Sequence, residues 1–538
     1  MENVARPGAA TGALVGALLT APLATLFYAG WKLAGLPFVP FPVFDWTARL
    51  LPGRVITFGI DSMVRAIRVL GIADTASAAK AAEQSMAVVV FVVAGIVVAA
   101  LLYAIQKALR SRAIFPGLVA GALLAVGVVA LLHAAARTET VAPALIDAWV
   151  VAAFVGWGLA LALVYRRLVP AFQPAVRPAY APVERVDRRQ FLVRLGGATA
   201  TITVVGAVVG ALAGGRRARP VVTGRRWSAD NPLPNADAGV KPAPGTRPEY
   251  TPLEDHYRID ITTSPPVIDG ATWRLKVGGL VDRPRELTLD QIRAYEPLHQ
   301  FVTLACVSNP VGGSLIGTTR WTGVSFQRLL ADLGVKPEAT HLKISAADQF
   351  YEVVALDTIR QDPRVMLAYD WDGVPLTTPH GFPLRIYIPD LYGMKQPKWI
   401  QSIEATDHWE PGYWVKRGWD RTARMKATAV IDTIAVNMMI AQADATTRIP
   451  VGGIAHAGAR GISKVEVQVD GGPWTPAQLR KPLSDTTWVI WRYDWPFRPG
   501  NHTFTVRCVD GRGTPQAVEM SAPHPAGASG YASKSMML

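Results

Sequence analysis

Cys306 is the residue whose type and setting most suggest chemistry. It ends a short apolar run at residues 302–305 and opens a Gly-rich loop at residues 308–313. Glycines after a strand allow a bulky ligand to approach the backbone closely, and a thiolate is a good ligand for soft metals. Taken alone, a cysteine at the end of an apolar strand is more often a packed small hydrophobe than a ligand.

Basic and amide side chains recur in the part of the chain downstream of Cys306. They gather in two short motifs, His380-Gly381-Phe382-Pro383-Leu384-Arg385 and Lys395-Gln396-Pro397-Lys398. An arginine offers a planar fork of donors that matches phosphate oxygens. The alternative for each charged member is a solvated surface side chain.

The sequence lacks the residues that haem and iron–sulfur centres require. The second cysteine, Cys508, sits in the alternating run 503–509, which predicts a strand, so we expect both thiols to be free. The sequence has no CxxC or CxxCH motif for an iron–sulfur cluster or a c-type haem. The one histidine in an apolar segment is His133, whereas a b-type haem between helices needs axial ligands such as a histidine pair. We therefore expect no intrinsic haem or Fe-S cluster.

The elements that must position these residues fall into a helical half and a sheet-rich half. Five segments before residue 215 approach the roughly 20 apolar residues that a membrane span needs. They cover residues 11–33, 85–105, 114–134, 144–165 and 197–213. Residues 41–51 and 55–70 carry charges at helical spacing, which indicates amphipathic helices. We therefore expect a transmembrane region of five helices, in contact with membrane lipids.

The distribution of arginine and lysine predicts how these helices are oriented. The loops at residues 106–113 and 166–196 are rich in both, which marks them as cytoplasmic. An odd number of spans then places everything after residue 215 outside the cytoplasm of a bacterial cell, in a multi-pass membrane protein. Asp187-Arg188-Arg189-Gln190-Phe191-Leu192 is similar to a twin-arginine signal, so we expect the twin-arginine and general secretion machinery as partners. The alternative is that the arginine pair is only positive-inside charge.

The formal net charge of +14 raises the question of nucleic acid as a partner. Much of the excess is arginine beside apolar segments, and the sequence has no zinc-finger spacing, aromatic RNA-binding motif or basic helix interleaved with aromatics. We therefore expect no nucleic acid partner.

Residues 256–408 resemble the molybdopterin domain of the sulfite oxidase family. The stretches that carry the resemblance include Tyr257-Arg258-Ile259-Asp260, Ala305-Cys306-Val307-Ser308-Asn309, Trp321-Thr322-Gly323-Val324 and Tyr392-Gly393-Met394-Lys395-Gln396-Pro397-Lys398-Trp399, together with the His380 motif. The resemblance implies Mo-molybdopterin as the cofactor, with Cys306 as the catalytic residue and the thiolate ligand of molybdenum. It also implies that the cofactor-binding residues are Arg258, Cys306, Asp348, His380, Arg385, Lys395, Gln396 and Lys398.

These patterns and the resemblance divide the chain into five parts. We expect a transmembrane region at 1–215, a Pro- and Gly-rich linker at 216–252, an α+β molybdopterin domain at 253–425, an immunoglobulin-like β-sandwich at 426–520 and a flexible tail at 521–538. The sandwich follows from alternating runs at 462–472, 488–495 and 502–509 between turn residues. It resembles the family's dimerisation domain, which makes a homodimer part of the expectation.

The implied function is a membrane-anchored molybdopterin-dependent oxidoreductase that transfers an oxo group to or from a small molecule on the extracytoplasmic side. Without a haem motif, it must exchange electrons with a separate partner, a cytochrome or a quinone-linked protein. One alternative is a sulfite oxidase proper. Another is a non-catalytic binding or assembly module that has lost the cofactor, which the presence of Cys306, His380 and Arg385 disfavours.

The expected substrate pocket departs from that of the sulfite enzymes. They place an arginine five residues after the metal cysteine, where this chain has Val311, and Trp414 and Trp419 lie in the region of their active-site tyrosine. Without that guanidinium, a sulfite dianion loses a charge-assisted pair of roughly 1.5–3 kcal/mol. We therefore expect poor sulfite turnover and better activity on a neutral or organic substrate such as a sulfoxide, unless Arg320 or Arg417 supplies the charge.

Overall fold

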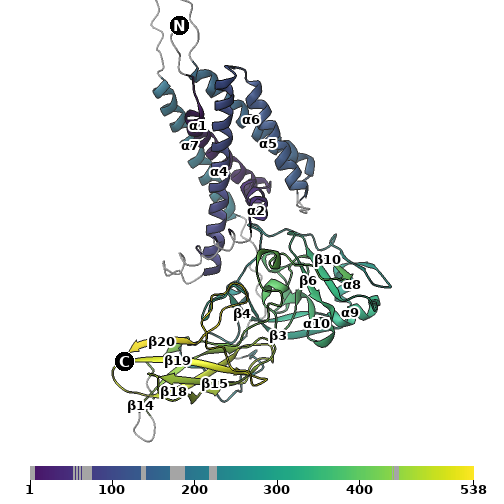
Figure 1. The fold of residues 1–538 in the computed structure, drawn as a ribbon, viewed down its shortest axis with the longest axis vertical. Coiled ribbons are helices and arrows are strands. Elements are labelled where there is room, and N and C mark those ends of the chain that lie inside the picture. The colour runs from purple at the N-terminus through teal and green to yellow at the C-terminus, as the bar shows by residue number, and fades with distance from the viewer. Residues whose placement is uncertain are drawn as a thin grey trace, which may run out of the picture. The chain divides into compact units, whose positions relative to one another are not determined.

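The computed structural model divides the chain into two compact units. It describes residues 6–52, 75–134, 141–169, 188–216, 227–228, 230–438, 440–441 and 447–538, with the isolated positions 55, 59 and 62. The first unit joins Met1–Leu51, Lys80–Val221 and Ile261–Val267, and the second joins Pro52–Ala79, Val222–Asp260 and Ile268–Leu538. Figure 1 shows that the first unit is helical and that the second is built mainly from strands.

The first unit is made of long apolar helices. They are α1 (Ala9–Ala34), α4 (Thr75–Ala108), α5 (Phe115–Ala134), α6 (Pro143–Leu168) and α7 (Arg188–Arg216), and the shorter α2 (Pro40–Leu50) accompanies them. Within the described residues, the five long helices are each long and apolar enough to cross a membrane. They cover the five apolar segments, so the expectation of helices there is confirmed. The arginine motif begins at Asp187, outside the described residues, and most of the expected helix at 55–70 also lies outside them.

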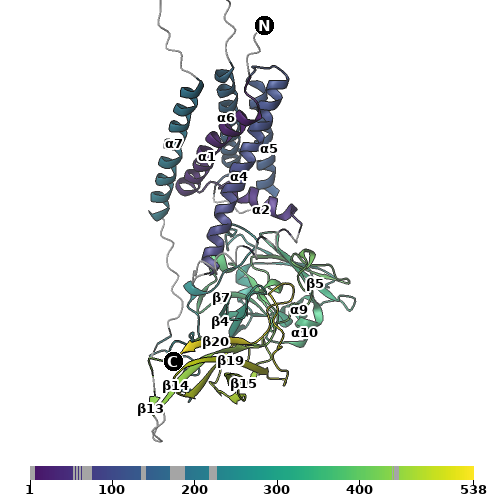
Figure 2. The same ribbon diagram turned by 60° about the vertical axis from the view of Figure 1, so that its left-hand side comes forward.

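Small residues allow the helices of this unit to pack closely. A Cβ atom at Gly117 would overlap the carbonyl oxygen of Gly158, so α5 and α6 meet backbone to backbone at this point. Figure 2 shows the long helices running in similar directions, with α2 set across them. The segment Ile261–Val267 joins the same unit, where the buried carboxylate of Asp45 on α2 accepts hydrogen bonds from Thr262 Oγ1 and Thr263 N, each at 3.0 Å.

Two five-stranded sheets form the first part of the second unit. One has the order β2-β1-β10-β5-β6 and the other the order β3-β4-β7-β8, with β9 also paired to β7. Their strands are β1 (Leu275–Gly279), β2 (Arg285–Leu287), β3 (Pro297–Ala305), β4 (Ile316–Ser325), β5 (His341–Ala346), β6 (Tyr351–Ala355), β7 (Met366–Trp371), β8 (Val374–Pro375), β9 (Arg385–Tyr387) and β10 (Ile400–Thr406). The pair β1–β10 is parallel. With α8 (Leu289–Arg293), α9 (Phe326–Leu333) and α10 (Leu356–Gln361), the expected α+β domain is confirmed.

The connection between β3 and β4 is the loop that carries Cys306. The two strands are antiparallel, and their last register pair joins Ala305 to Ile316. At the base of the loop, the amide of Cys306 donates to the carbonyl of Leu315 at 2.9 Å. The amide of Leu315 donates to Oδ1 of Asn309 at 2.9 Å. These two bonds tie the loop to the strand ends, so Cys306 is held where the sheet ends.

Two antiparallel sheets share one apolar core at the C-terminal end. The first contains β11 (Thr428–Ala429), β12 (Thr433–Ile434), β13 (Ile440–Ala441), β14 (Thr447–His456), β17 (Gln478–Leu479) and β18 (Val489–Pro496). The second contains β15 (Ile462–Val469), β16 (Thr475–Pro476), β19 (Asn501–Asp510) and β20 (Ala532–Met537). Ile449 and Trp491 from the first sheet pack with Val467 and Phe504 from the second.

The expectation of a flexible tail is wrong for its last part. Residues 532–537 form β20, which pairs with β19 in an antiparallel register from Val506–Ala532 to Asn501–Met537. Small polar residues such as Ser533 and Ser535 are poor strand formers by themselves. They form a strand here because β19 offers its free edge, and the hydroxyls of Thr503 and Thr505 bond those of Ser535 and Ser533.

The stretch expected as a linker packs on the C-terminal sheets. Residues 230–252 contain no helix or strand. Arg480 instead binds their backbone: its guanidinium donates to the carbonyl oxygens of Asn235, Ala238 and Val240 at 2.8–3.1 Å. The same side chain pairs with Glu249 at 3.0 Å. A Pro- and Gly-rich segment can therefore hold a fixed course when a buried arginine satisfies its carbonyl groups.

Candidate functional site

The thiol of Cys306 is buried at the start of the β3–β4 loop. Its Sγ atom lies 3.0 Å from Oγ of Ser308. Burial raises the pKa of the thiol, while the hydrogen bond from Ser308 and the charge of Lys398 act in the opposite direction. A bound metal would deprotonate such a thiol outright.

Four of the predicted cofactor-binding residues lie in one cluster, in which Arg385 is buried and Arg258, His380 and Lys398 are half-buried. Arg258 Nε and Lys398 Nζ both bind Oδ2 of Asp260, at 2.7 and 3.2 Å. Arg385 donates from Nη1 to the carbonyl oxygen of His380 at 3.1 Å. The ring of His380 lies edge-on to that of His256, with centroids 5.6 Å apart. We call these residues the basic cluster: Arg258, His380, Arg385, Lys398 and the additional His256.

Burial and mutual repulsion shift the charges of the basic cluster. Burial lowers the pKa of Lys398 to about 8, against the attraction of Asp260. Burial likewise lowers the pKa of Arg385 to about 10. The pKa of His380 falls well below its usual value because of burial and of four basic neighbours, His256, Lys398, Arg385 and Arg258. An anion placed among these groups would raise the pKa of each of them and so oppose the effect of burial.

One donor and one acceptor of the basic cluster are buried without a partner among the described residues. They are Nε of Arg385, which is a donor, and Nε2 of His256, which is an acceptor because Nδ1 donates to the carbonyl oxygen of Tyr257 at 3.3 Å and burial lowers the pKa of the ring to about 4. Buried polar atoms are normally hydrogen-bonded, so such orphans call for a missing ligand. Gly381, with φ +111°, brings the backbone within contact of the Arg385 and Lys398 side chains. The cations, the unpartnered donor of Arg385 and the close backbone together fit a phosphate-bearing heterocycle such as molybdopterin.

Cys306 lies within electrostatic reach of the basic cluster. The charge of Lys398 acts to lower the pKa of the thiol. The pKa of Tyr257 is raised mainly by burial, and Cys306 raises it further. Tyr257 stacks on His256, with ring centroids 5.4 Å apart. The structure therefore brings Cys306, Arg258, His380, Arg385 and Lys398 into one region.

Three other predicted residues have partners outside the basic cluster. Lys395 binds Oε1 of Glu352 at 2.8 Å in a buried pair. Gln396 donates from Nε2 to the carbonyl oxygens of Ile388 and Leu391, at 3.2 and 2.7 Å, but its Oε1 is buried without a described partner. Asp348 accepts from the amide of Phe350 at 3.1 Å in the β5–β6 turn.

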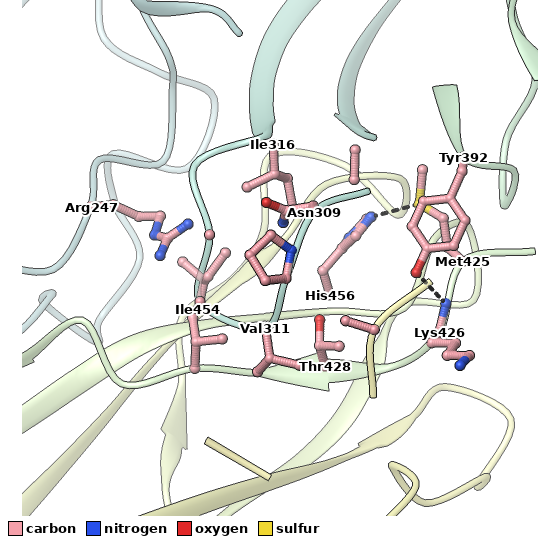
Figure 3. Close-up of a pocket in the computed structure, with 16 residues that line it drawn as sticks. Arg247, Asn309, Val311, Ile316, Tyr392, Met425, Lys426, Thr428, Ile454 and His456 are labelled. Carbon is pink, nitrogen blue, oxygen red and sulfur yellow. Dashed lines mark hydrogen bonds between the residues drawn. The ribbon is translucent and has the colours of Figure 1, made fainter. Parts of the chain in front are cut away.

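A pocket is lined in part by the loop that follows Cys306 (Figure 3). Its lining is Arg247, Ala305, Asn309, Pro310, Val311, Gly312, Gly313, Ile316, Tyr392, Met425, Lys426, Thr428, Val430, Ile454, His456 and Ala528. Tyr392 lines this pocket, and its pKa is raised by burial and, to a smaller extent, by Cys306. Neither Arg320 nor Arg417 is among the lining residues. Trp419 is near the loop and packs with Ala305 and Val307.

Several residues of this region gave no usable signal in the sequence. Arg247 stands in a Pro- and Gly-rich stretch that lacks a motif, and His456 is a single histidine in a strand. His456 is buried, its Nε2 lies 3.2 Å from Sδ of Met425, and its Nδ1 has no described partner. For His256 the sequence did offer a signal, because this residue directly precedes the family-like stretch that begins at Tyr257.

Comparisons with known proteins agree with this geometry. Residues 262–414 match the oxidoreductase molybdopterin binding domain. The chain is 32% identical over 246 residues to the putative protein-methionine-sulfoxide reductase subunit YedZ1 of Azospira oryzae, an alignment that covers 44% of this chain and 88% of that protein. It is 33% identical over 169 residues to the uncharacterized oxidoreductase YuiH of Bacillus subtilis, covering 30% and 83%. It is 25% identical over 289 residues to the sulfite oxidase of Gallus gallus, covering 44% and 61%.

The chain belongs to the sulfite oxidase family. As a member of that family it is a molybdopterin-dependent oxidoreductase, and the expectation drawn from residues 256–408 is confirmed. Mo-molybdopterin is accordingly the cofactor of this sulfite oxidase family protein. The basic cluster and the Cys306 loop both lie within the matched domain, apart from His256 and Arg258, which immediately precede it.

Proposed function

We propose that this protein transfers an oxo group to or from a small substrate at a molybdenum centre held by Cys306. The observation that carries the proposal is the basic cluster beside the buried thiol, in which Nε of Arg385 is a buried donor without a described partner. When bound, molybdopterin supplies the metal that gives or accepts the oxo group. The chain supplies the thiolate, the cations that fix the cofactor, and a buried setting that excludes water.

Each predicted residue has a place in this proposal. Arg258, His380, Arg385 and Lys398 hold the anionic part of the cofactor, since they form the basic cluster. Gln396 offers its unpaired Oε1 to a donor of the pterin. Lys395, in its buried pair with Glu352, is proposed as a further contact of the cofactor. Asp348, in the β5–β6 turn, is proposed as a contact of the pterin ring.

The proposal also covers location and partners. Five apolar helices support a membrane anchor, with the catalytic unit on the extracytoplasmic side after export through the twin-arginine pathway. Electrons pass to or from a separate cytochrome or quinone-linked protein. The two C-terminal sheets with a common core support an immunoglobulin-like domain through which two copies of the chain associate.

Metal and pterin analysis of the purified full-length protein tests the cofactor assignment. We expect about one molybdenum per chain by mass spectrometry and pterin fluorescence after denaturation. A folded sample from a molybdenum-replete culture that carries neither would support the alternative of a binding or assembly module and would overturn the proposal.

The substrate class is tested by steady-state kinetics with an artificial dye as the electron partner. Val311 and its neighbours Pro310, Ile316 and Ile454 give the pocket an aliphatic wall. We therefore expect a sulfoxide to be reduced more efficiently than sulfite is oxidised. A sulfite kcat/KM near 10⁶ M⁻¹s⁻¹, on the order of a dedicated enzyme, would make the protein a sulfite oxidase proper.

A further inference from the structure

The pocket beside the Cys306 loop combines an aliphatic wall with two basic side chains, one of which is paired with the carboxylate of Asp432. Its charged lining residues are Arg247 and Lys426, and no carboxylate is among the described residues that line it. Lys426 is tied to the carbonyl oxygen of Gly527 at 2.6 Å. The buried His456, with its unpartnered Nδ1, adds a neutral polar group to the same lining. Such a pocket suits a ligand that is apolar on one side and anionic on the other.

Arg247 reaches this pocket from the segment at residues 230–252. Asp432 fixes its guanidinium: Nε lies 3.0 Å from both carboxylate oxygens, and Nη2 lies 2.6 Å from Oδ1. The backbone amide of Arg247 also donates to Oδ2 of Asp432 at 3.1 Å. Among the described residues, the side-chain hydrogen bonds of Arg247 use Nε and Nη2. The third nitrogen, Nη1, takes part in none of these bonds.

The tight turn before Arg247 sets its position. The amide of Thr246 donates to the carbonyl oxygen of Ala243 at 2.9 Å. Gly245 takes φ +89°, and a Cβ at that position would crowd the side chain of Thr433. The turn and Asp432 together hold the guanidinium against the pocket lined by Val311 and Asn309 (Figure 3). A guanidinium held in place by a carboxylate keeps its remaining donors ready for a second anion.

We propose that Arg247 binds the anionic group of the substrate and so sets substrate specificity. This inference rests on the proposed oxo-transfer function and deepens it. The chain has Val311 where the sulfite enzymes have an arginine. In this proposal Arg247, 64 positions earlier in the sequence, supplies the guanidinium instead. The anion is either sulfite itself or the carboxylate of an organic sulfoxide whose apolar part lies on Val311, Ile316 and Ile454. Arg247 is a binding residue, and it takes no part in the transfer of the oxo group.

A matched pair of substrates separates charge recognition from chemistry. An alkyl sulfoxide with a terminal carboxylate and its methyl ester present the same sulfoxide, and sulfite forms the third arm. In Arg247→Gln we expect KM for the carboxylate to rise roughly ten- to a hundred-fold, the equivalent of one charge-assisted hydrogen bond, with kcat unchanged and the ester unaffected. If sulfite is the true source of the anion, the increase in KM falls on sulfite instead.

Two further variants guard against a structural explanation. Arg492→Gln removes another arginine that binds the same segment, through the carbonyl oxygen of Lys241 at 3.2 Å, but lies outside the pocket lining. We expect it to leave all three KM values unchanged. Arg247→Gln with Asp432→Asn removes both charges of the pair, so it avoids a buried unpaired carboxylate and should show the same loss as Arg247→Gln. An equal loss for acid and ester, or no loss for any anion, would overturn the proposal.

Binding of sulfate gives a result that does not depend on turnover. Sulfate is a redox-inert dianion, and its affinity for the full-length holoprotein can be measured by calorimetry. We expect roughly tenfold weaker binding in Arg247→Gln and wild-type binding in Arg492→Gln. If the wild-type protein turns over no sulfoxide and no sulfite, the proposed function fails, but sulfate binding still tests Arg247. Sulfate affinity that is the same in wild type and Arg247→Gln would overturn the inference.

Discussion

At the scale of single residues, the same residue types serve very different purposes in this protein. Cys306 and Cys508 are both buried thiols. Cys508 lies within β19, where its Sγ donates to Oε1 of Gln516 at 3.3 Å and burial raises its pKa to about 12. Cys306 lies at a loop base beside the basic cluster, where the charge of Lys398 opposes the effect of burial on the pKa of the thiol. The environment therefore separates a packed thiol from a ligand candidate.

Cys306→Ser tests the ligand role directly. A hydroxyl replaces the soft thiolate with little change of volume, so we expect the cofactor to remain bound through the basic cluster while turnover falls by a large factor. Molybdenum content and kcat measured on the same sample check this result. Cys508→Ser is the matched control, because it changes the same atom far from the loop and should leave kcat unchanged. Wild-type turnover in Cys306→Ser would refute the assignment.

At the scale of elements, one arginine decides the course of a whole segment. Arg480 gathers three backbone carbonyl groups and the carboxylate of Glu249, and both partners of that ion pair are buried. The segment at residues 230–252 carries Arg247 to the pocket. The element that looks least structured by composition therefore positions a proposed substrate contact.

Arg480→Ala should destabilise this arrangement strongly. The substitution leaves the carboxylate of Glu249 and several carbonyl groups without their buried donor, and breaking a buried ion pair costs about 3–5 kcal/mol. The loss is measurable as a lower free energy of unfolding in denaturant titrations, with faster proteolysis between residues 227 and 252. Arg492→Ala, whose pair with Asp494 is more exposed, should cost about 1 kcal/mol or less. Equal costs for the two variants would contradict this account.

At the scale of the whole molecule, the chain joins a helical unit of membrane-spanning length to a cofactor-binding unit. A cofactor inserted before export would require a pathway that carries folded proteins, and this is why we propose that the arginine pair at residues 188–189 serves as a twin-arginine signal. The five long helices alone do not require it, because paired arginines before a span also satisfy the positive-inside rule.

The export route is tested by Arg188→Lys combined with Arg189→Lys. The double change keeps the positive charge, so a purely topological role would be unaffected, whereas a twin-arginine receptor should reject the lysine pair. We expect four inserted helices and a cofactor domain that stays in the cytoplasm. Protease added to intact spheroplasts checks this outcome, and cleavage of the domain in the variant as in wild type would show that the signal is not used.

The sequence alone determined those features that local pattern encodes. Apolar runs of sufficient length fixed the five long helices, because each run satisfies its own backbone hydrogen bonds. The short motifs around Cys306, His380 and Lys398 identified the family, because their residue types and their order along the chain can be recognised without a structure. Immunoglobulin-like topology and the roles of individual site residues stay predictions.

Only the tertiary structure decided which groups meet. Arg247 and Asp432 lie 185 residues apart in the sequence, and Asn235 and Lys481 lie 246 apart. Lys395 has a buried partner, Glu352, that lies 43 positions earlier in the sequence. The strand at residues 532–537 exists because β19 offers an open edge. Burial and long-range pairing set the charge and the purpose of each of these side chains, and neither quantity is a property of neighbours in the sequence.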